Sequence, residues 1–276
     1  MTDLPPPPEP LPHPVVDNHC HLDIARDGEA LPVEEALAAA ASVGVTRIVQ
    51  IGCDVERARW AVDAAATYDA LVAGVALHPN EAPRVADLDA AMAGIEELAQ
   101  AHDKVRAVGE TGLDHYRTGE DGRAAQVESF RRHIDLAKRL GKTLVIHDRD
   151  AHHEVLRVLD EEGAPERWVM HCFSGDALFA RACLDRGAYL SFAGTLTFKN
   201  AEPLRGALRM TPSDRLLVET DAPFLTPSPH RGRTNASYLV PVTMRSMAEV
   251  RGDDLEALCA AVDGNTSEAF GGVWGR

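Results

Sequence analysis

The strongest constraint on the fold is a regular alternation of short apolar runs with longer amphipathic segments. After Pro14, eight runs of aliphatic and β-branched residues recur along the chain, and each is continuous. Runs of this kind are typical of strands that are buried on both faces of a parallel sheet. They lie at residues 15–17, 47–52, 71–77, 105–110, 143–147, 168–171, 188–192 and 216–220.

The intervals between the runs are predicted to be helices. Clear amphipathic segments lie at residues 33–43, 56–68, 126–140 and 177–186, and a final helix is expected at about 253–270. Gly44, Gly141 and Gly187 follow three of these segments, where a left-handed cap favours glycine. Strands that alternate with helices predict an α/β fold with a parallel sheet. The 276 residues suit a (β/α)₈ TIM barrel, which takes about 250 residues, and a doubly wound open sheet is the alternative.

The domain organisation follows from the distribution of proline. Residues 1–14 are rich in proline and are expected to form a flexible tail, either extended or disordered. Residues 15–276 contain no second linker of this kind and no internal repeat, which predicts a single barrel domain. We expect a monomer without an obligate protein partner.

Charge and cysteine content limit the possible functions and locations. The net charge is −15, whereas a general DNA-coating protein would be basic. Contact with nucleic acid would therefore need a local site, where metal ions could supply positive charge. The five cysteines are scattered, which favours a reducing compartment. No apolar run approaches the roughly 20 residues of a membrane helix, and no secretory signal is visible, so we expect a cytoplasmic protein without membrane contact.

Polar residues follow the ends of most of the predicted strands. In a barrel the carboxyl ends of all strands meet at one mouth, where active sites lie. Residues that are distant in sequence would therefore share a single site. They are His19, His21, His78, Glu110, His147, His171 and Asp221.

These residue types are those of a metal site. His19 and His21 are two positions apart, so they face the same side of a strand. Either histidine alone could be an ordinary packed residue, and Glu110 alone could belong to a buried ion pair. Together with His147, His171 and Asp221, they predict metal binding. Two sites are possible if Glu110 bridges, and mixed nitrogen and oxygen ligands suit Zn²⁺, Mn²⁺, Co²⁺ or Mg²⁺. Asp17 and Asp23 are candidate hydrogen-bond acceptors for the ligating imidazoles.

Five motifs resemble those of the TatD family of metal-dependent deoxyribonucleases, in the family's order. The resemblance extends from about residue 15 to residue 271, where the segment 265–271 is similar to the family's C-terminal helix. The motifs are DNHCHLD at 17–23, GETGLD at 109–114, VIHDRDA at 145–151, HCFSG at 171–175 and ETDAPFLTP at 219–227, followed by PHRG at 229–232 and Asn235. The chain departs from the family at Asn18, Thr111, residues 191–194 and residues 236–237, and the last two departures concern substrate fit.

The resemblance implies a TIM barrel of the amidohydrolase type with two divalent metal ions. By position, His19, His21, Glu110 and Asp221 would hold one ion, and Glu110, His147 and His171 would hold the other, with Glu110 bridging. Asp221 would accept a proton from the attacking water.

Other residues are assigned roles around the metals. The resemblance places His78 near the mouth, and we expect His78, Arg149 and Arg231 to contact the substrate. Glu219 is expected to support a ligand. His133 lies in a helical stretch, and we interpret it as a surface group.

Three function hypotheses remain. The first is metal-assisted hydrolysis of DNA phosphodiester bonds, of the 3′–5′ exonuclease type, with DNA as the substrate. The second is a hydrolase of the same fold that acts on an ester or amide, such as misacylated tRNA. The third is a metal-bound scaffold without catalysis.

Overall fold

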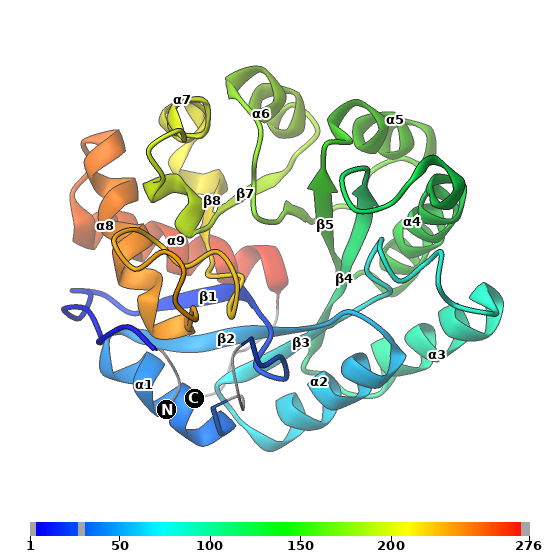
Figure 1. Ribbon diagram of the computed structural model, residues 1–276, viewed down its shortest axis with the longest axis horizontal. Coiled ribbons are helices and arrows are strands. Elements are labelled where there is room, and N and C mark those ends of the chain that lie inside the picture. The colour runs from blue at the N-terminus through cyan, green and yellow to red at the C-terminus, as the bar shows by residue number, and fades with distance from the viewer. Residues whose placement is uncertain (1–3, 27–30, 272–276) are drawn as a thin grey trace.

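The computed structural model describes residues 4–26 and 31–271 and shows a single sheet of eight parallel strands (Figure 1). Each strand pairs with the next one along the chain. The strands are β1 (Val15–Cys20), β2 (Val45–Gly52), β3 (Leu71–Val75), β4 (Val105–Asp114), β5 (Thr143–Arg149), β6 (Trp168–Met170), β7 (Tyr189–Phe192) and β8 (Leu216–Val218). A parallel bridge between Cys20 and Ala222 and a 2.9 Å hydrogen bond from the Asp221 N–H to the His19 carbonyl oxygen link the first strand to the segment after the last. The sheet is therefore a nearly closed barrel, and the open-sheet alternative is wrong.

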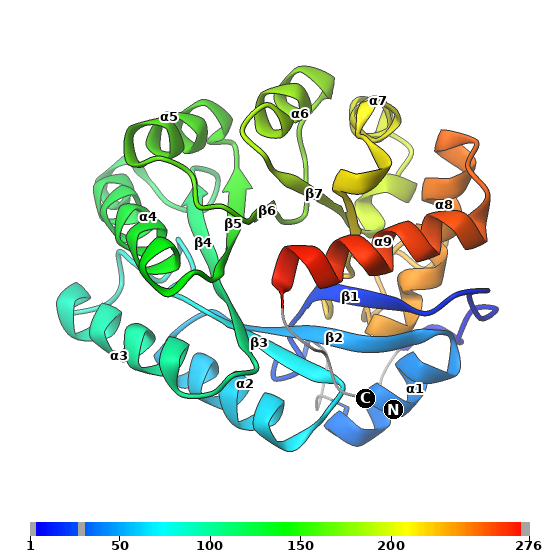
Figure 2. The ribbon, with the colours of Figure 1, turned by 180° about the vertical axis from the view of Figure 1, so that it is seen from behind.

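Helices surround the barrel as an outer layer (Figures 1 and 2). They are α1 (Val33–Ser42), α2 (Val55–Thr67), α3 (Leu88–Gln100), α4 (Glu120–Leu140), α5 (His152–Glu162), α6 (Ala177–Leu184), α7 (Glu202–Met210), α8 (Val240–Arg251) and α9 (Leu255–Phe270), with short 3₁₀ turns at Gly194–Thr197, Ser213–Arg215 and Ser237–Leu239. Gly44, Gly141 and Gly187 have positive φ angles, as predicted for glycine after a helix.

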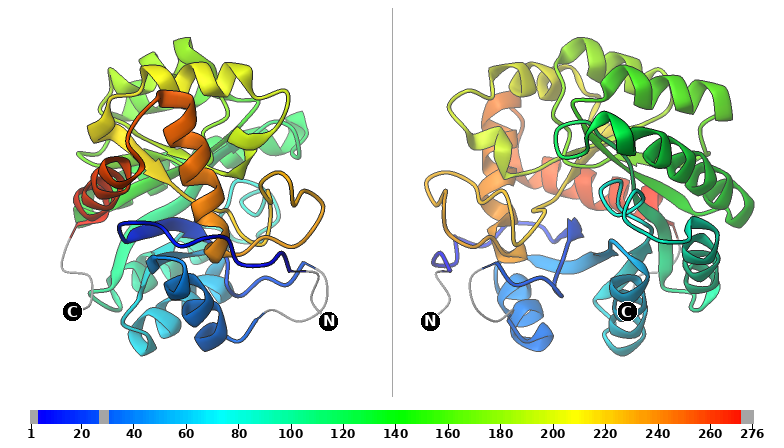
Figure 3. Two further views of the ribbon diagram at one scale, coloured as in Figure 1. Left: turned by 90° about the vertical axis from the view of Figure 1, so that its left-hand side faces the viewer. Right: turned by 45° about the vertical axis from the view of Figure 1, so that its right-hand side comes forward.

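Helix α9 closes the amino-terminal end of the barrel. Ala269 and Phe270 pack with a layer of inward-facing strand residues that includes Val16, Val49 and Val145. The Thr143 hydroxyl donates a 2.5 Å hydrogen bond to the Ala269 carbonyl oxygen. Figure 3 shows α9 at one end of the molecule and the loops that follow the strands at the other. The carboxyl ends of the strands therefore form the only end of the described barrel that α9 leaves open.

Strand β4 extends four residues beyond the predicted end at Glu110. Its last part pairs with β5, from Thr111 opposite Ile146 to Asp114 opposite Arg149. Gly112 permits this close approach because its φ is +136°, and a Cβ atom there would collide with the His147 carbonyl oxygen. The extension brings Asp114 to the level of the mouth.

The proline-rich segment at residues 4–14 is extended, as its composition predicts, but it is attached to the barrel. Residues 1–3 lie outside the described part of the chain. The Leu11 N–H donates a 3.0 Å hydrogen bond to the Val43 carbonyl oxygen, and the Leu11 side chain is buried. The Tyr238 hydroxyl donates a 2.5 Å hydrogen bond to the Pro5 carbonyl oxygen. We call residues 4–14 the N-terminal strap.

His133 is buried, so its interpretation as a surface group is wrong. It lies on the face of α4 that also buries Ser129, Phe130 and Ala137. Its Nε2 atom accepts a 3.1 Å hydrogen bond from the Leu77 N–H, and its Nδ1 atom lies 2.7 Å from the Ser129 carbonyl oxygen. The imidazole therefore satisfies a backbone donor at the end of β3.

Neither a membrane-spanning helix nor a disulfide bond is found among the described residues. No described helix combines the length and the apolar character that a membrane span requires. The five cysteines are free thiols.

Candidate metal centre

Glu110 is the centre of a buried group of imidazoles at the mouth of the barrel. Its Oε1 atom lies 3.5 Å from the Nε2 atoms of both His19 and His21. Its Oε2 atom lies 3.0 Å from His171 Nε2 and 3.1 Å from His147 Nδ1. The fold thus brings together side chains from β1, β4 and β5 and from the segments just after β1 and β6. Each carboxylate oxygen faces a different pair of histidines.

Asp221 completes the group on the side of His19 and His21. Its Oδ1 atom lies 3.4 Å from His21 Nε2 and 3.9 Å from His19 Nε2. The residue has a φ of +54°, a conformation that aspartate tolerates better than most side chains. Its side chain is 16% exposed, compared with 5% for Glu110. Asp221 is therefore the carboxylate that water can reach.

Three overlapping sets of side chains have ligand atoms within 4.8 Å of one another. They are His19 with His21 and Glu110, His78 with Glu110 and His147, and His19 with His171 and Glu219. The sequence assigned His78 to substrate contact, but its Nε2 atom lies 3.7 Å from Glu110 Oε2, so it also has the position of a ligand. The site offers more donor atoms than one cation requires.

His19 provides a direct test of whether the site suits a metal. Its side chain is fully buried, and neither ring nitrogen has a hydrogen-bond partner among the described residues. A buried polar atom without a partner is costly, and a cation between His19 and the carboxylates would satisfy its Nε2 atom. The residues present therefore fit a divalent ion.

The carboxylates and most of the imidazoles of this group stabilise each other's charged forms. Burial by itself favours a protonated Glu110, but the facing His171 and His78 and the hydrogen bond to His147 hold its pKa well below the usual range. Burial has the same effect on Asp221, and His21 and His171 lower the pKa of that carboxyl. Burial and the nearby His171 lower the pKa of His19, so its imidazole is neutral. Burial opposes a charge on His21, His147 and His171, but facing carboxylates raise their pKa values. A cation would bind here by replacing those protons, because neutral imidazoles and ionised carboxylates are the forms that bind metals.

Glu219 fixes the orientation of His171. Its Oε1 atom lies 3.1 Å from His171 Nδ1 and accepts a 2.9 Å hydrogen bond from the Cys172 N–H. Its Oε2 atom accepts a 2.5 Å hydrogen bond from the Ser191 hydroxyl. The Nε2 atom of His171 is thereby directed at Glu110.

Asp17 and Asp23 do not hydrogen-bond to the imidazoles, so that prediction is wrong. Asp17 accepts hydrogen bonds from the Thr220 N–H at 2.9 Å and the Thr220 hydroxyl at 2.6 Å, and it joins β1 to the segment after β8. Burial raises the pKa of Asp17 to about 7. Asp23 instead accepts from Gln50 and Arg57, at 2.7 Å each. The imidazole of His21 uses a backbone acceptor, the Ile51 carbonyl oxygen, at 3.0 Å.

Sequence reasoning missed two further residues at the centre. Asp114 Oδ2 lies 3.3 Å from His147 Nε2 and accepts a 3.0 Å hydrogen bond from the Asn80 amide. The Cys53 thiol lies 3.5 Å from Glu110 Oε1, and burial raises its pKa to about 12, so it stays protonated. Asp114 belongs to the GETGLD motif, which was the available signal, whereas nothing in the sequence pointed to Cys53.

Arg149 and Arg231 do not join the buried group. Both are exposed and belong to segments that follow residues of the metal centre. The Arg149 guanidinium lies 4.2 Å from the centroid of the Tyr116 ring, and that of Arg231 lies 4.0 Å from the Phe198 ring. The two arginines are thus at the rim of the mouth.

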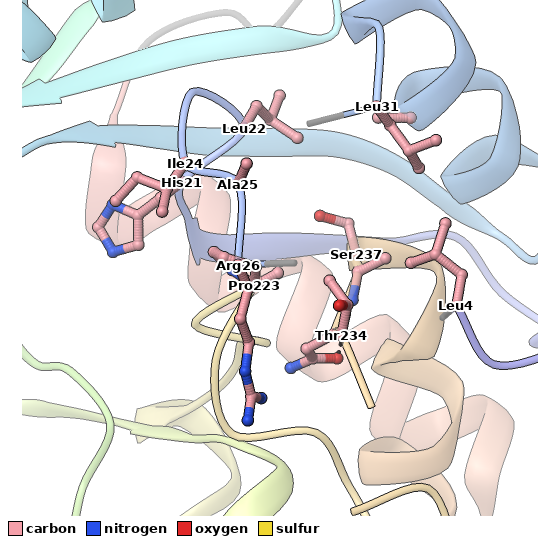
Figure 4. A pocket seen from close by; sticks show the side chains of 14 residues that line it. Leu4, His21, Leu22, Ile24, Ala25, Arg26, Leu31, Pro223, Thr234 and Ser237 are labelled. Atoms are coloured by element: carbon pink, nitrogen blue, oxygen red, sulfur yellow. Dashed lines mark hydrogen bonds between the residues drawn. The ribbon is translucent and has the colours of Figure 1, made fainter. Parts of the chain in front are cut away.

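A small, mostly apolar cavity lies beside His21, and Leu4 at the start of the N-terminal strap contributes to its lining (Figure 4). Its volume is about 60 Å³, and Leu4, Leu22, Leu31 and Pro223 contribute to its lining. In Figure 4 the His21 ring points away from Leu4 and Leu31. Among the described lining residues, His21 is the one that also belongs to the group around Glu110.

Comparisons with known proteins agree with this geometry. Residues 16–271 match the family model described as TatD related DNase. A metal-dependent hydrolase of Mycobacterium tuberculosis named TatD, described as uncharacterized, is 46% identical over 95% of this chain and 100% of its own length. The YabD protein of Bacillus subtilis, described in the same words, is 38% identical over 92% and 98% of the two chains. The crystal structure of the TatD homolog YJJV from Escherichia coli superposes with a TM-score of 0.86 at 27% identity, and covers 93% of this chain and 97% of its own. The chain is a metal-dependent hydrolase and belongs to the TatD-related DNase family.

Proposed function

We propose that the protein hydrolyses phosphodiester bonds of DNA at a pair of divalent metal ions. The observation that carries the proposal is the position of Glu110, whose two oxygens face two different pairs of imidazoles at 3.0–3.5 Å. A carboxylate in this position can bridge two cations. His19, His21 and Asp221 would hold one ion with Glu110, and His147 and His171 would hold the other.

Asp221 is the proposed general base. When bound, divalent ions lower the pKa of water and offset the negative charge of the phosphate. Asp221 is ionised and partly exposed, so it can accept the proton of the attacking water and release it to solvent. Glu219 holds His171 in one orientation, and Arg149 and Arg231 can donate paired hydrogen bonds to neighbouring phosphates.

We further propose that DNA is degraded stepwise from the 3′ end. DNA as the substrate is supported by the description of the matching family as DNases and by the two arginines at the rim. The same centre could hydrolyse an ester or amide, since both reactions use a metal-activated water. Esters such as misacylated tRNA are therefore the alternative substrates.

The test is nuclease activity on end-labelled single-stranded DNA. The protein is stripped of metal and supplied separately with Mg²⁺, Mn²⁺ or Zn²⁺. Release of mononucleotides from the 3′ end, reduced by about 10²–10⁴-fold in Asp221→Asn, is the expected result. Asp63→Asn is a matched control, because Asp63 is exposed on α2. Cleavage of an aminoacyl ester without cleavage of DNA would contradict the proposal.

A further inference from the structure

Large apolar side chains that remain exposed are concentrated at the mouth of the barrel. Among the described residues they are Tyr116, Leu178 and Phe224, which are 66%, 81% and 40% exposed. Tyr116 and Phe224 lie in the connections that follow β4 and β8, and Leu178 lies in the first turn of α6, the helix that follows β6. Exposed apolar groups that collect around one site indicate a binding surface. Two of the three are aromatic rings, in a chain with only 5% aromatic residues.

Tyr116 is held next to the metal centre by the extension of β4. Its N–H donates a 3.0 Å hydrogen bond to Asp114 Oδ1, and the other oxygen of Asp114 lies 3.3 Å from His147. The His115 N–H donates to the Arg149 carbonyl oxygen at 2.9 Å, which places Arg149 beside the tyrosine. The guanidinium covers the ring at 4.2 Å, yet two thirds of Tyr116 remains exposed. The backbone hydrogen bonds therefore fix the position of Tyr116, and most of its surface remains accessible to a ligand.

Phe224 occupies the equivalent place on the other side of the mouth. Its N–H donates a 2.9 Å hydrogen bond to the Asp221 carbonyl oxygen, and its ring centroid lies 6.3 Å from that of His21. Because the strands run in order around the barrel, β4 and β8 are opposite each other, with the metal centre between them (Figure 1). The loop that contains Phe224 also contains Arg231, stacked on Phe198.

We infer that Tyr116 and Phe224 are stacking positions for the unpaired bases of a single-stranded nucleic acid that crosses the mouth. This assignment rests on the phosphodiesterase function proposed above. Aromatic rings accept every base, because each base has a π face, and arginines beside them suit the backbone phosphates. With a net charge of −15, the protein cannot bind a polyanion through its overall charge, whereas stacking does not depend on charge. Bases within a duplex are stacked on one another and cannot offer their faces, so the substrate class is single-stranded.

The test compares a single strand with an analogue that lacks its bases. One oligonucleotide carries thymine throughout, and the other has the same length and phosphates but tetrahydrofuran in place of each nucleoside. For Tyr116→Ala and Phe224→Ala we expect KM for the thymine strand to rise about tenfold with little change in kcat. KM for the base-free strand should not change. Tyr116→Phe, which keeps the ring, should restore the wild-type KM.

Tyr68→Ala is the matched control, since Tyr68 is an aromatic residue at the end of α2 away from the mouth. Thermal unfolding of each variant checks that the fold is kept. Unchanged KM in both alanine variants, or an equal rise for both strands, would overturn the stacking role. Binding of the labelled thymine strand, measured by fluorescence anisotropy, separates the two proposals. Base-dependent binding without cleavage would contradict only the phosphodiesterase function, and neither binding nor cleavage would contradict both.

Discussion

At the scale of single residues, Glu110 connects the two halves of the candidate centre. Its carboxylate is nearly inaccessible and is ionised because imidazoles surround it. An isolated buried carboxylate would be strongly destabilising. The site is therefore arranged for a cation, and the negative charge of Glu110 should matter more than its shape.

Glu110→Gln keeps the shape of the side chain and removes its charge. We expect the metal content per chain, measured by inductively coupled plasma mass spectrometry, to fall by half or more. Hydrolytic activity should fall by at least about a hundredfold. Glu128→Gln, an exposed position on α4, serves as the control and should bind metal normally.

An alternative centre is available if Glu110 is not the bridge. His19, His171 and Glu219 also lie close enough together to share an ion. Full metal content in Glu110→Gln combined with loss in Glu219→Gln would move the principal site to that set.

The residues missed in the sequence show what a motif alone leaves out. His19, His21, Glu110, His147, His171 and Asp221 could be proposed together because each follows an apolar run. For Asp114 the GETGLD motif was the available signal, and no apolar run pointed to it, since its position depends on β4 continuing to pair with β5 after Glu110. Among the acceptors of the imidazoles, Glu219 was expected to support a ligand and lies beside His171, whereas the acceptor of His21 could not be predicted. His21 uses a backbone carbonyl, which no side-chain pattern reveals.

At the level of secondary-structure elements, the sequence predicts all eight strands, but it does not predict every helix boundary. Continuous apolar runs predicted all eight strands, because parallel strands buried on both faces need them. Helix α4 begins at Glu120, six residues before its predicted start at 126, because its first turn is polar and lacks the apolar period. The proline content of residues 4–14 predicted a flexible tail, either extended or disordered. It did not predict the hydrogen bonds to the Val43 carbonyl oxygen and from the Tyr238 hydroxyl.

The attachment of the strap can be tested through Leu11. The side chain is 8% exposed and packs into the main hydrophobic core, so Leu11→Ala should lower the free energy of unfolding by about 2 kcal/mol. Urea denaturation followed by circular dichroism measures this loss. Pro12→Ala changes the exposed neighbouring residue and should alter stability by less than about 0.5 kcal/mol. Equal stability of Leu11→Ala and wild type would mean that the strap is detached in solution.

In the molecule as a whole, the candidate catalytic groups lie at one end of the barrel, and the packing of α9 stabilises the other end. The metal centre, the arginines of the rim and the exposed aromatic rings belong to the carboxyl ends of the strands, whereas α9 and the apolar layer beneath it close the other end. The net charge of −15 is distributed over a molecule whose proposed phosphate contacts are local. The free energy of unfolding should therefore depend on pH through buried titratable groups far from the mouth, in addition to those of the metal centre.

His133 is the clearest of these groups, because burial lowers its pKa to about 4. In the unfolded chain an imidazole titrates near 6.5, so below that pH the unfolded state binds a proton that the folded state does not accept. Stability due to this residue is therefore lost as the pH falls from about 6.5 to about 4. His133→Gln removes the titration, and between pH 8 and pH 5 the wild type should lose about 2 kcal/mol more of its free energy of unfolding than the variant does. Urea denaturation at the two pH values measures the difference, in which the titrations shared by both proteins cancel. Equal losses in the two proteins would show that His133 takes up a proton in the folded state as readily as in the unfolded chain.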